Sequence, residues 1–166
     1  MRDRLTTSSQ AIEGQAVERA ACLVSRWCQA WNAHDIDALA ALVTDDVAFV
    51  TVSGNRLLGR DEFRRHHQNI HQDQMRESTW QTLGWEWRHL PPALLLVHVE
   101  WTIDGDRNPT GVALRPRRFG LFTWLLAMTN DDYRILAAHN TDLRPGISHR
   151  SVRAIRARLE IEGIQQ

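Results

Sequence analysis

The sequence has little cysteine and no excess charge of either sign. Its 166 residues include only two cysteines, Cys22 and Cys28. They lie six positions apart in a segment of helical pattern, so their side chains point in different directions and a disulfide is not expected. Twenty Lys and Arg residues balance twenty Asp and Glu residues, which leaves no overall field that attracts nucleic acid or an anionic partner. We therefore expect reduced thiols, a cytoplasmic location and no nucleic-acid partner.

Long apolar runs and cofactor motifs are also lacking. The longest apolar runs, such as Ala93–Val99, are far shorter than a bilayer span, and the first ten residues lack the apolar core of a signal peptide. No Gly-rich phosphate loop, dinucleotide fingerprint, nucleophile elbow or Cys-based zinc spacing occurs. His67 and His71 have the i, i+4 spacing of a chelating pair, but no third ligand stands beside them, which favours incidental histidines. We expect no membrane association, no cofactor and no metal.

Tryptophan, by contrast, is abundant, with seven residues spread along the chain. Such rings fill a thick core or line a ligand cavity, and the core is the commoner case. Apolar residues recur every three or four positions from Ala11 to Ala33, which predicts one long amphipathic helix. We expect residues 1–10, which are polar, to be disordered. In the WNAHD stretch at residues 31–35, His34-Asp35 resembles an acid-base pair, but Asp35 is better placed to cap a second helix over 36–43.

The remaining pattern predicts an α+β domain over residues 11–144. A strand over 47–53 is followed by a helix that opens at Gly59 and turns His67 inward. Four further strands follow, so the helices pack on one face of a curved sheet. Their predicted ranges are 78–90, 93–105, 117–129 and 133–143. We expect residues 145–166 to form a helical tail, whose basic pattern suits a membrane or nucleic acid less well than an oligomer contact or a solvated helix.

Alternation along the strands assigns faces to some residues only. In the strand from Leu94, the odd positions are apolar and predict the core face. In the last strand, alternation does not decide whether His139 and Thr141 or Asn140 and Asp142 face inward. The Gly105–Pro116 segment suits a mobile lid or a plain connection, and the connection is favoured.

Taken in order, these motifs resemble the SgcJ/EcaC family, within the SnoaL-like and ketosteroid isomerase-like superfamily that shares the nuclear transport factor 2 fold. The stretches that carry the resemblance are WNAHDIDALAALVTDDVAFVTVSG, GRDEFRRHH, LLLVHVEW, RRFGLFTWLL and YRILAAHNTDL. The resemblance implies a cone-shaped sheet wrapped around the long first helix, with a pocket between helices and sheet. It also implies a homodimer through the outer sheet face, which suits the side of His98, Glu100 and Thr102. Many relatives act on polycyclic polyketides or steroids as isomerases, cyclases or hydrolases; closer ones, often labelled oxidoreductases, occur in antibiotic pathways.

The catalytic residues of ketosteroid isomerases do not carry over. Their oxyanion tyrosine falls at Trp27, their aspartate base at Thr51, and their second acid near Phe122 or Thr123. Without a carboxylate base, classical steroid isomerase activity is not expected.

Three residues remain as candidates for catalysis. His67 and the His139-Asn140 pair have the chemistry of an acid-base group and a carbonyl-binding amide. In the simpler alternative, His67 and Asn140 only form hydrogen bonds with backbone groups at the end of a helix and of a strand.

The sequence thus predicts a protein of secondary metabolism that binds a bulky apolar or polycyclic small molecule, with acid-base chemistry through His67 or His139 and no cofactor. The expected ligand-contacting residues are Trp27, Thr51, Trp85, Trp87 and Trp101. One alternative is a non-catalytic module that dimerises or sequesters a product. A weaker one is an oxidoreductase, although no flavin, haem or nicotinamide signature is visible.

Overall fold

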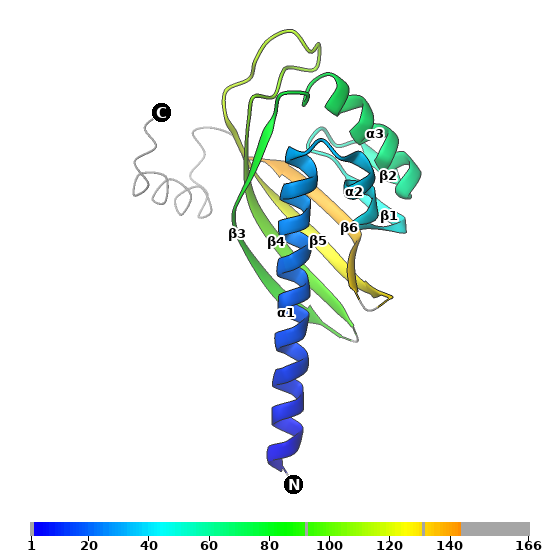
Figure 1. The fold of residues 1–166 in the computed structure, drawn as a ribbon, viewed down its shortest axis with the longest axis vertical. Helices are drawn as coiled ribbons and strands as arrows, with labels where there is room; N and C mark the ends of the chain where they lie inside the picture. The colour runs from blue at the N-terminus through cyan, green and yellow to red at the C-terminus, as the bar shows by residue number, and fades with distance from the viewer. Residues whose placement is uncertain (1, 92, 131, 144–166) are drawn as a thin grey trace, which may run out of the picture.

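The described part of the chain folds into three helices and six strands (Figure 1). The computed structural model describes residues 2–91, 93–130 and 132–143. The helices are α1 (Arg2–Asn32), α2 (Ile36–Ala41) and α3 (Arg60–Gln72). The strands are β1 (Val43–Val50), β2 (Arg56–Leu58), β3 (Thr79–Leu90), β4 (Leu94–Asp104), β5 (Arg118–Thr129) and β6 (Asp132–Asp142). The predicted α+β class is confirmed.

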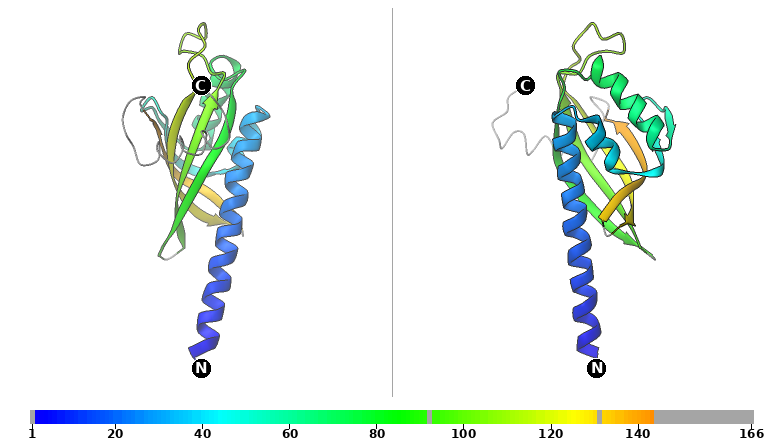
Figure 2. Two further views of the ribbon diagram at one scale, coloured as in Figure 1. Left: turned by 90° about the vertical axis from the view of Figure 1, so that its left-hand side faces the viewer. Right: turned by 45° about the vertical axis from the view of Figure 1, so that its right-hand side comes forward.

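All six strands form one curved sheet in the order β2-β1-β6-β5-β4-β3. The β1–β6 pair is parallel and every other pair is antiparallel. The helices cover one side of this sheet, with α1 passing along it and α3 lying over β1 and β2 (Figures 1 and 2). Residues on the inner side of the sheet therefore meet the helices and form the core.

The first helix is longer than predicted. It begins at Arg2 instead of Ala11 and ends at Asn32, one residue from the predicted end at Ala33. The apolar stripe marks only the part of the helix that packs, and the N-terminal half extends beyond the sheet (Figure 2). Asp35 caps α2 as predicted, because its carboxylate accepts a 2.9 Å hydrogen bond from the Ala38 amide.

The first strand begins earlier in the chain than predicted, and the second strand was not predicted. β1 begins at Val43, which shares the helical spacing of the residues before it, and its pairing with β6 is irregular between Val43 and Ala48. The exposed Asp45 and Asp46 lie in this irregular part and interrupt the alternation. β2 has only three residues, too few for a periodic signal.

Each end of the four C-terminal strands lies within one residue of its predicted position. The odd residues of β4 form the core face, as predicted. A register shift between Leu125 and Leu126 interrupts the pairing of β5 with β6. Beyond this irregularity Asn140 is half-buried and His139 is exposed, which settles the face that the pattern left open.

The cysteines and the long loop agree with their predictions. Cys22 and Cys28 are free, as expected. The Gly105–Pro116 segment is a structured connection, in which the Asn108 carboxamide oxygen accepts hydrogen bonds from the amides of Val112 and Ala113. The predicted helical tail within residues 145–166 lies outside the described residues.

The amide of Asn32 joins α1 to the open edge of the sheet. Its Oδ1 accepts a 2.7 Å hydrogen bond from the Trp80 backbone N–H, and its Nδ2 donates at 2.9 Å to the Trp80 carbonyl. The side chain thus pairs with β3 as a neighbouring strand would. This contact fixes the end of α1 over the interior.

Candidate functional site

The space between helices and sheet is filled by an aromatic cluster, called the chamber below. Trp27 of α1 lies at its centre, with seven other rings at centroid distances of 6.3 Å or less. The chamber comprises Trp27, Trp31, Phe49, Phe63, His67, Trp80, Trp101, Phe122 and Trp124. Its rings come from β1, β3, β4 and β5 and from α1 and α3, because the inner positions of the strands and the apolar faces of the helices converge there.

Two indole N–H groups in the chamber have no hydrogen-bond acceptor among the described residues. Trp27 is 1% exposed and Trp124 is fully buried, and the Nε1 atoms of both are unpartnered. Their ring centroids are 5.3 Å apart. An unpaired buried donor costs roughly 1–3 kcal/mol, so both positions favour an occupant that carries an acceptor oxygen.

His67 is the polar base in the chamber. It is 3% exposed, and its Nδ1 lies 2.8 Å from the Phe63 carbonyl oxygen. Because a carbonyl can only accept, Nδ1 carries the proton and Nε2 carries the lone pair. Burial, with smaller contributions from His66 and His71, lowers the pKa of His67 to about 3, against the raising effect of the Phe63 carbonyl. The ring is therefore neutral near pH 7 and offers a lone pair.

The other two predicted catalytic residues lie apart from His67. Asn140 is on the inner face of β6, where its Oδ1 accepts a 2.9 Å hydrogen bond from Trp101 Nε1. His139 is exposed on the outer face, opposite Thr123 of β5. The structure therefore brings His67 together with Trp27 and Asn140 together with Trp101, and separates His139 from both.

The predicted ligand-contacting residues divide into two groups. Trp27 and Trp101 are buried members of the chamber. Trp85 and Trp87 are half-buried on β3 and pack against the core, while buried Thr51 accepts a 3.2 Å hydrogen bond from the Asn55 amide. Thr51 thus also serves the turn between β1 and β2.

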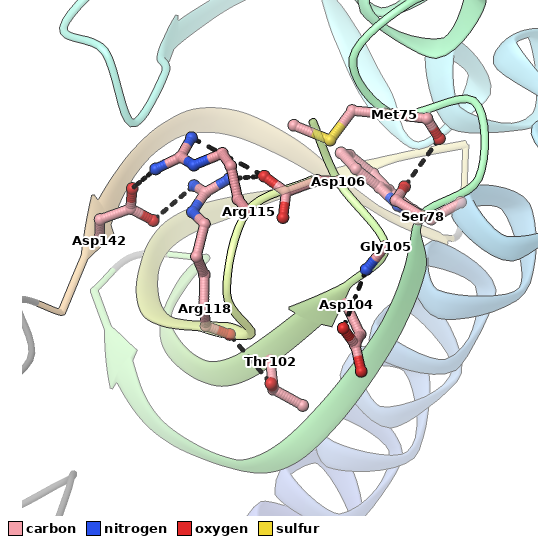
Figure 3. A network of polar contacts seen from close by, with 10 residues as sticks. Met75, Ser78, Thr102, Asp104, Gly105, Asp106, Arg115, Arg118 and Asp142 are labelled. Atoms are coloured by element: carbon pink, nitrogen blue, oxygen red, sulfur yellow. Dashed lines mark hydrogen bonds and ion pairs between the residues drawn. The ribbon is translucent and has the colours of Figure 1, made fainter. Parts of the chain in front are cut away.

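A charged network beside the chamber was not predicted (Figure 3). Arg118 of β5 donates to Asp106 at 2.5 Å and to Asp142 of β6 at 2.6 Å. Arg115 lies 3.7 Å from Asp106 and 3.8 Å from Asp142. Burial opposes the charge of Arg118, but the hydrogen bonds and charges of the two aspartates outweigh it and raise the pKa of the guanidinium. The sequence signal was Arg118 at the end of a long loop, which pattern alone could not pair with its partners.

A second polar feature lies where α1 ends, outside the chamber. A groove of about 480 Å³ runs beside α2 and α3 and is lined by His34, Asp35, Ile36, Asp37, Arg64, Gln68, His71 and Gln72. In its wall the Nδ1 atoms of His34 and His71 lie 2.8 Å apart, and the His71 ring is 4.5 Å from that of Trp31. Burial, and then the charge of His34, lower the pKa of His71 to about 4. Within the described ranges no three His, Cys, Asp or Glu side chains are placed to hold a metal ion.

This geometry defines a class of protein: single α+β domains in which a curved sheet wraps around a long helix and encloses a core of ring side chains. The chain belongs to the SnoaL-like domain family, whose model matches residues 24–127. No curated protein matches the chain. No helix in the described part is both long and apolar enough to cross a membrane.

Solved structures share the fold. An uncharacterised protein with a cystatin-like fold from Caulobacter vibrioides is 21% identical, with a TM-score of 0.72 over 89% of this chain and 98% of its own. A "Putative Scytalone Dehydratase" from Novosphingobium aromaticivorans is 14% identical, with a TM-score of 0.66 over 87% and 93%. A "putative dehydratase from the NTF2-like family" from Streptomyces avermitilis is 17% identical, with a TM-score of 0.64 over 78% and 97%. These likenesses establish the fold.

Proposed function

We propose that this chain binds a bulky, mostly apolar aromatic molecule in the chamber and holds a carbonyl oxygen of that molecule with the indole N–H groups of Trp27 and Trp124. The observation that carries the proposal is the pair of buried donors without acceptors. Ring-lined interiors with a few polar groups are typical of small-molecule sites. The SnoaL-like family, and two structural neighbours whose names include "putative dehydratase" and "Putative Scytalone Dehydratase", support a small-molecule ligand.

The chemistry that fits these groups is cofactor-independent proton transfer beside the carbonyl. Nε2 of His67 takes the proton from the adjacent carbon, and the electron pair of that C–H bond moves into an enolate. The enolate oxygen is stabilised by the Trp27 and Trp124 N–H groups, which act as an oxyanion hole. Return of the proton to the same or another carbon gives exchange or isomerisation. With a pKa of about 3, His67 is a weak base, so this step depends on strong stabilisation of the enolate by the two indole N–H groups.

The test uses α-tetralone, a bicyclic aromatic ketone, and tetralin, which lacks the carbonyl. We expect the full-length protein to bind α-tetralone more tightly in equilibrium dialysis, by about fivefold or more. Trp27→Phe and Trp124→Phe keep a ring but remove the N–H group, and should abolish this preference. Trp80→Phe is the matched control, because Trp80 Nε1 already donates to Thr82 Oγ1 at 3.4 Å. Equal affinity for the two compounds would refute the carbonyl site.

Catalysis is tested separately by deuterium exchange. In deuterated buffer, the protein should speed the exchange of the protons next to the carbonyl of α-tetralone, as followed by NMR. His67→Asn should abolish the acceleration and keep ligand binding, because Asn retains an N–H group for the Phe63 carbonyl. Binding without any acceleration would favour a non-catalytic protein.

That second candidate, a ligand-sequestering or dimerisation module, has its own supporting observation. The chamber rings contact one another closely, with a Trp80–Trp101 centroid distance of 4.9 Å. A ligand must displace some of these rings to enter. Failure of the wild type to bind α-tetralone and tetralin alike would favour a module that uses the cone only as a rigid support.

The finer assignments rest on the order of motifs. The same proposal includes membership of the SgcJ/EcaC branch, a role in secondary metabolism of polyketide or enediyne type, and a cytoplasmic location. So is a homodimer that pairs through the outer face of the sheet, on the side of His98, Glu100 and Thr102. Half-buried Leu121 and Leu125 lie on this face beside them and support the pairing.

A further inference from the structure

We propose that the groove beside α2 and α3 is a binding site for a small organic cation, an amine in its ammonium form. This groove, called the α2–α3 groove below, lies outside the chamber, so the inference does not rest on the proposed function. Its volume of about 480 Å³ is typical of small-molecule sites. One wall comes from residues 34–37, between α1 and the first turn of α2, and the other comes from one face of α3.

The α2–α3 groove carries more negative than positive charge. Asp37 on one wall and Arg64 on the other form a 2.9 Å ion pair, so their charges balance. Asp35 forms no ion pair with another described residue, and its Oδ1 alone serves to cap α2. The pKa of His71, lowered to about 4, leaves that ring uncharged near pH 7. The carboxylate of Asp35 therefore remains to attract a positively charged ligand.

Hydrogen-bond direction also indicates a ligand that donates. The cap leaves Asp35 Oδ2 unused as an acceptor. His71 is 7% exposed in the groove wall, and its Nε2 has no partner among the described residues. When His71 Nδ1 donates to His34 Nδ1, this Nε2 carries a lone pair. The amide oxygens of Gln68 and Gln72 line the same wall. An ammonium group has three N–H donors and no acceptor, which matches these atoms.

Other ligands and the neighbouring groove fit less well. No three metal-binding side chains meet within the described ranges, and an anion would be repelled by Asp35. A second groove, of about 400 Å³, lies beside β3 and β4. Its carboxylates are both paired at 2.7 Å, Glu77 with Arg107 and Asp104 with Arg117. Because these charges already balance, we expect an amine to select the α2–α3 groove.

The experiment compares benzylamine with benzyl alcohol, which has nearly the same shape but no charge. Each compound is titrated into the full-length, isotope-labelled protein at pH 8 and low salt and followed by NMR, since histidine is uncharged at this pH and salt screens the attraction. We expect benzylamine to bind about fivefold more tightly, as a hydrogen bond to a charged group provides. The shifted amide signals should belong to residues 34–37 and 64–72.

Two substitutions should move the affinity in opposite directions. Asp35→Asn removes the charge but keeps the cap, because Asn caps a helix as well as Asp does, and should reduce benzylamine binding to the level of benzyl alcohol. Arg64→Gln leaves Asp37 unpaired and should tighten benzylamine binding by about twofold or more. Asp104→Asn is the matched control, because it removes a carboxylate from the second groove and should leave the affinity unchanged. An unchanged pattern of amide signals away from each substitution shows that the variants are folded.

Three outcomes would overturn this site. They are equal or absent binding of the two compounds by the wild type, benzylamine binding that Asp35→Asn leaves unchanged, and weaker binding by Arg64→Gln, which would assign the groove to an anion. None of them bears on the carbonyl site in the chamber, because α-tetralone is uncharged and is tested by its own variants.

Discussion

His34 and His71 meet head to head. Their Nδ1 atoms are 2.8 Å apart while their ring centroids are 5.0 Å apart, so the two nitrogens lie almost on the line that joins the rings. Two neutral imidazoles can share one proton in this geometry, and their lone pairs do not converge on a third point as metal ligands do. His71 Nε2 is buried without a partner, which favours His71 as the donor through Nδ1. The bond ties the corner after α1 to the last turn of α3.

This pair should show energetic coupling. We expect His34→Ala and His71→Ala each to lower the free energy of unfolding, and a double-mutant cycle at pH 7.5 to give a coupling of about 0.5–1.5 kcal/mol. Urea unfolding of the four proteins measures it. His66→Ala serves as a control on the same helix, and its combination with His34→Ala should be additive. Additivity of the His34 and His71 changes would contradict a shared proton.

Buried neutral histidines should make the fold sensitive to acid. The pKa of His67 is lowered to about 3 and that of His71 to about 4, both chiefly by burial. The unfolded chain takes up protons on these rings near pH 6.5, before the folded chain does. The free energy of unfolding is therefore at its full value above pH 6.5 and falls as the pH drops toward 4. Each unit by which folding lowers a histidine pKa corresponds to a loss of up to about 1.4 kcal/mol.

His67→Asn should make that fall shallower, because one of the two rings no longer titrates on unfolding. The measurement is a set of urea unfolding curves between pH 7.5 and 4.5. His139→Asn is the matched control, since it removes an exposed ring on the outer face. A slope in His67→Asn as steep as in the wild type would show that the acid sensitivity comes from other groups.

Sequence periodicity predicted most of the fold because the packed elements are regular. β4 and β5 alternate in burial along most of their length, and the core half of α1 carries one apolar stripe, so their packed parts were placed closely. The errors fall where regularity fails. β1 carries two exposed aspartates and an irregular pairing, β2 has three residues, and the apolar stripe in the sequence begins after the first residues of α1.

The candidate site was predicted only in part. His67 could be turned inward because its helix is amphipathic, and the place of Trp27 on the apolar face of α1 was visible. The Asp106–Arg118 ion pair joins a loop to a strand, and the His34–His71 bond joins two residues 37 positions apart. Such contacts depend on how the elements meet in three dimensions, which no local spacing records.

A glycine gives room for Trp101 in the wall of the chamber. At Gly120 of β5, an added Cβ would lie 1.9 Å from Cζ2 of Trp101 and 2.7 Å from the Thr141 carbonyl oxygen. We expect Gly120→Ala to lower the free energy of unfolding by about 1–3 kcal/mol, as overpacking does. Gly14→Ala is the control, because a Cβ added at Gly14 meets no atom within 4 Å. Gly54→Ala is less suitable, because Gly54 has a positive φ. Unchanged stability in Gly120→Ala would mean that the Trp101 ring has freedom to move aside.

The outer face of the sheet should mediate a homodimer. Leu121 pairs with Glu100 of β4 and Thr141 of β6, and Leu125 lies four residues on along the same face of β5. The helices occupy the other side of the sheet (Figure 2), so no described helix covers these side chains. A stable interface needs about 800 Å² from each partner, which a face of several strands can supply.

We expect the full-length protein to be a dimer at micromolar concentration in size-exclusion chromatography with light scattering, and Leu121→Glu to be a monomer with an unchanged far-UV circular dichroism spectrum. A charge at the centre of a two-fold interface meets its own copy or a desolvated surface, and both are costly. Leu58→Glu is the matched control, because Leu58 is 54% exposed on β2, at the edge of the sheet and away from β5. A wild-type monomer, or a Leu121→Glu dimer, would place the contact elsewhere or remove it.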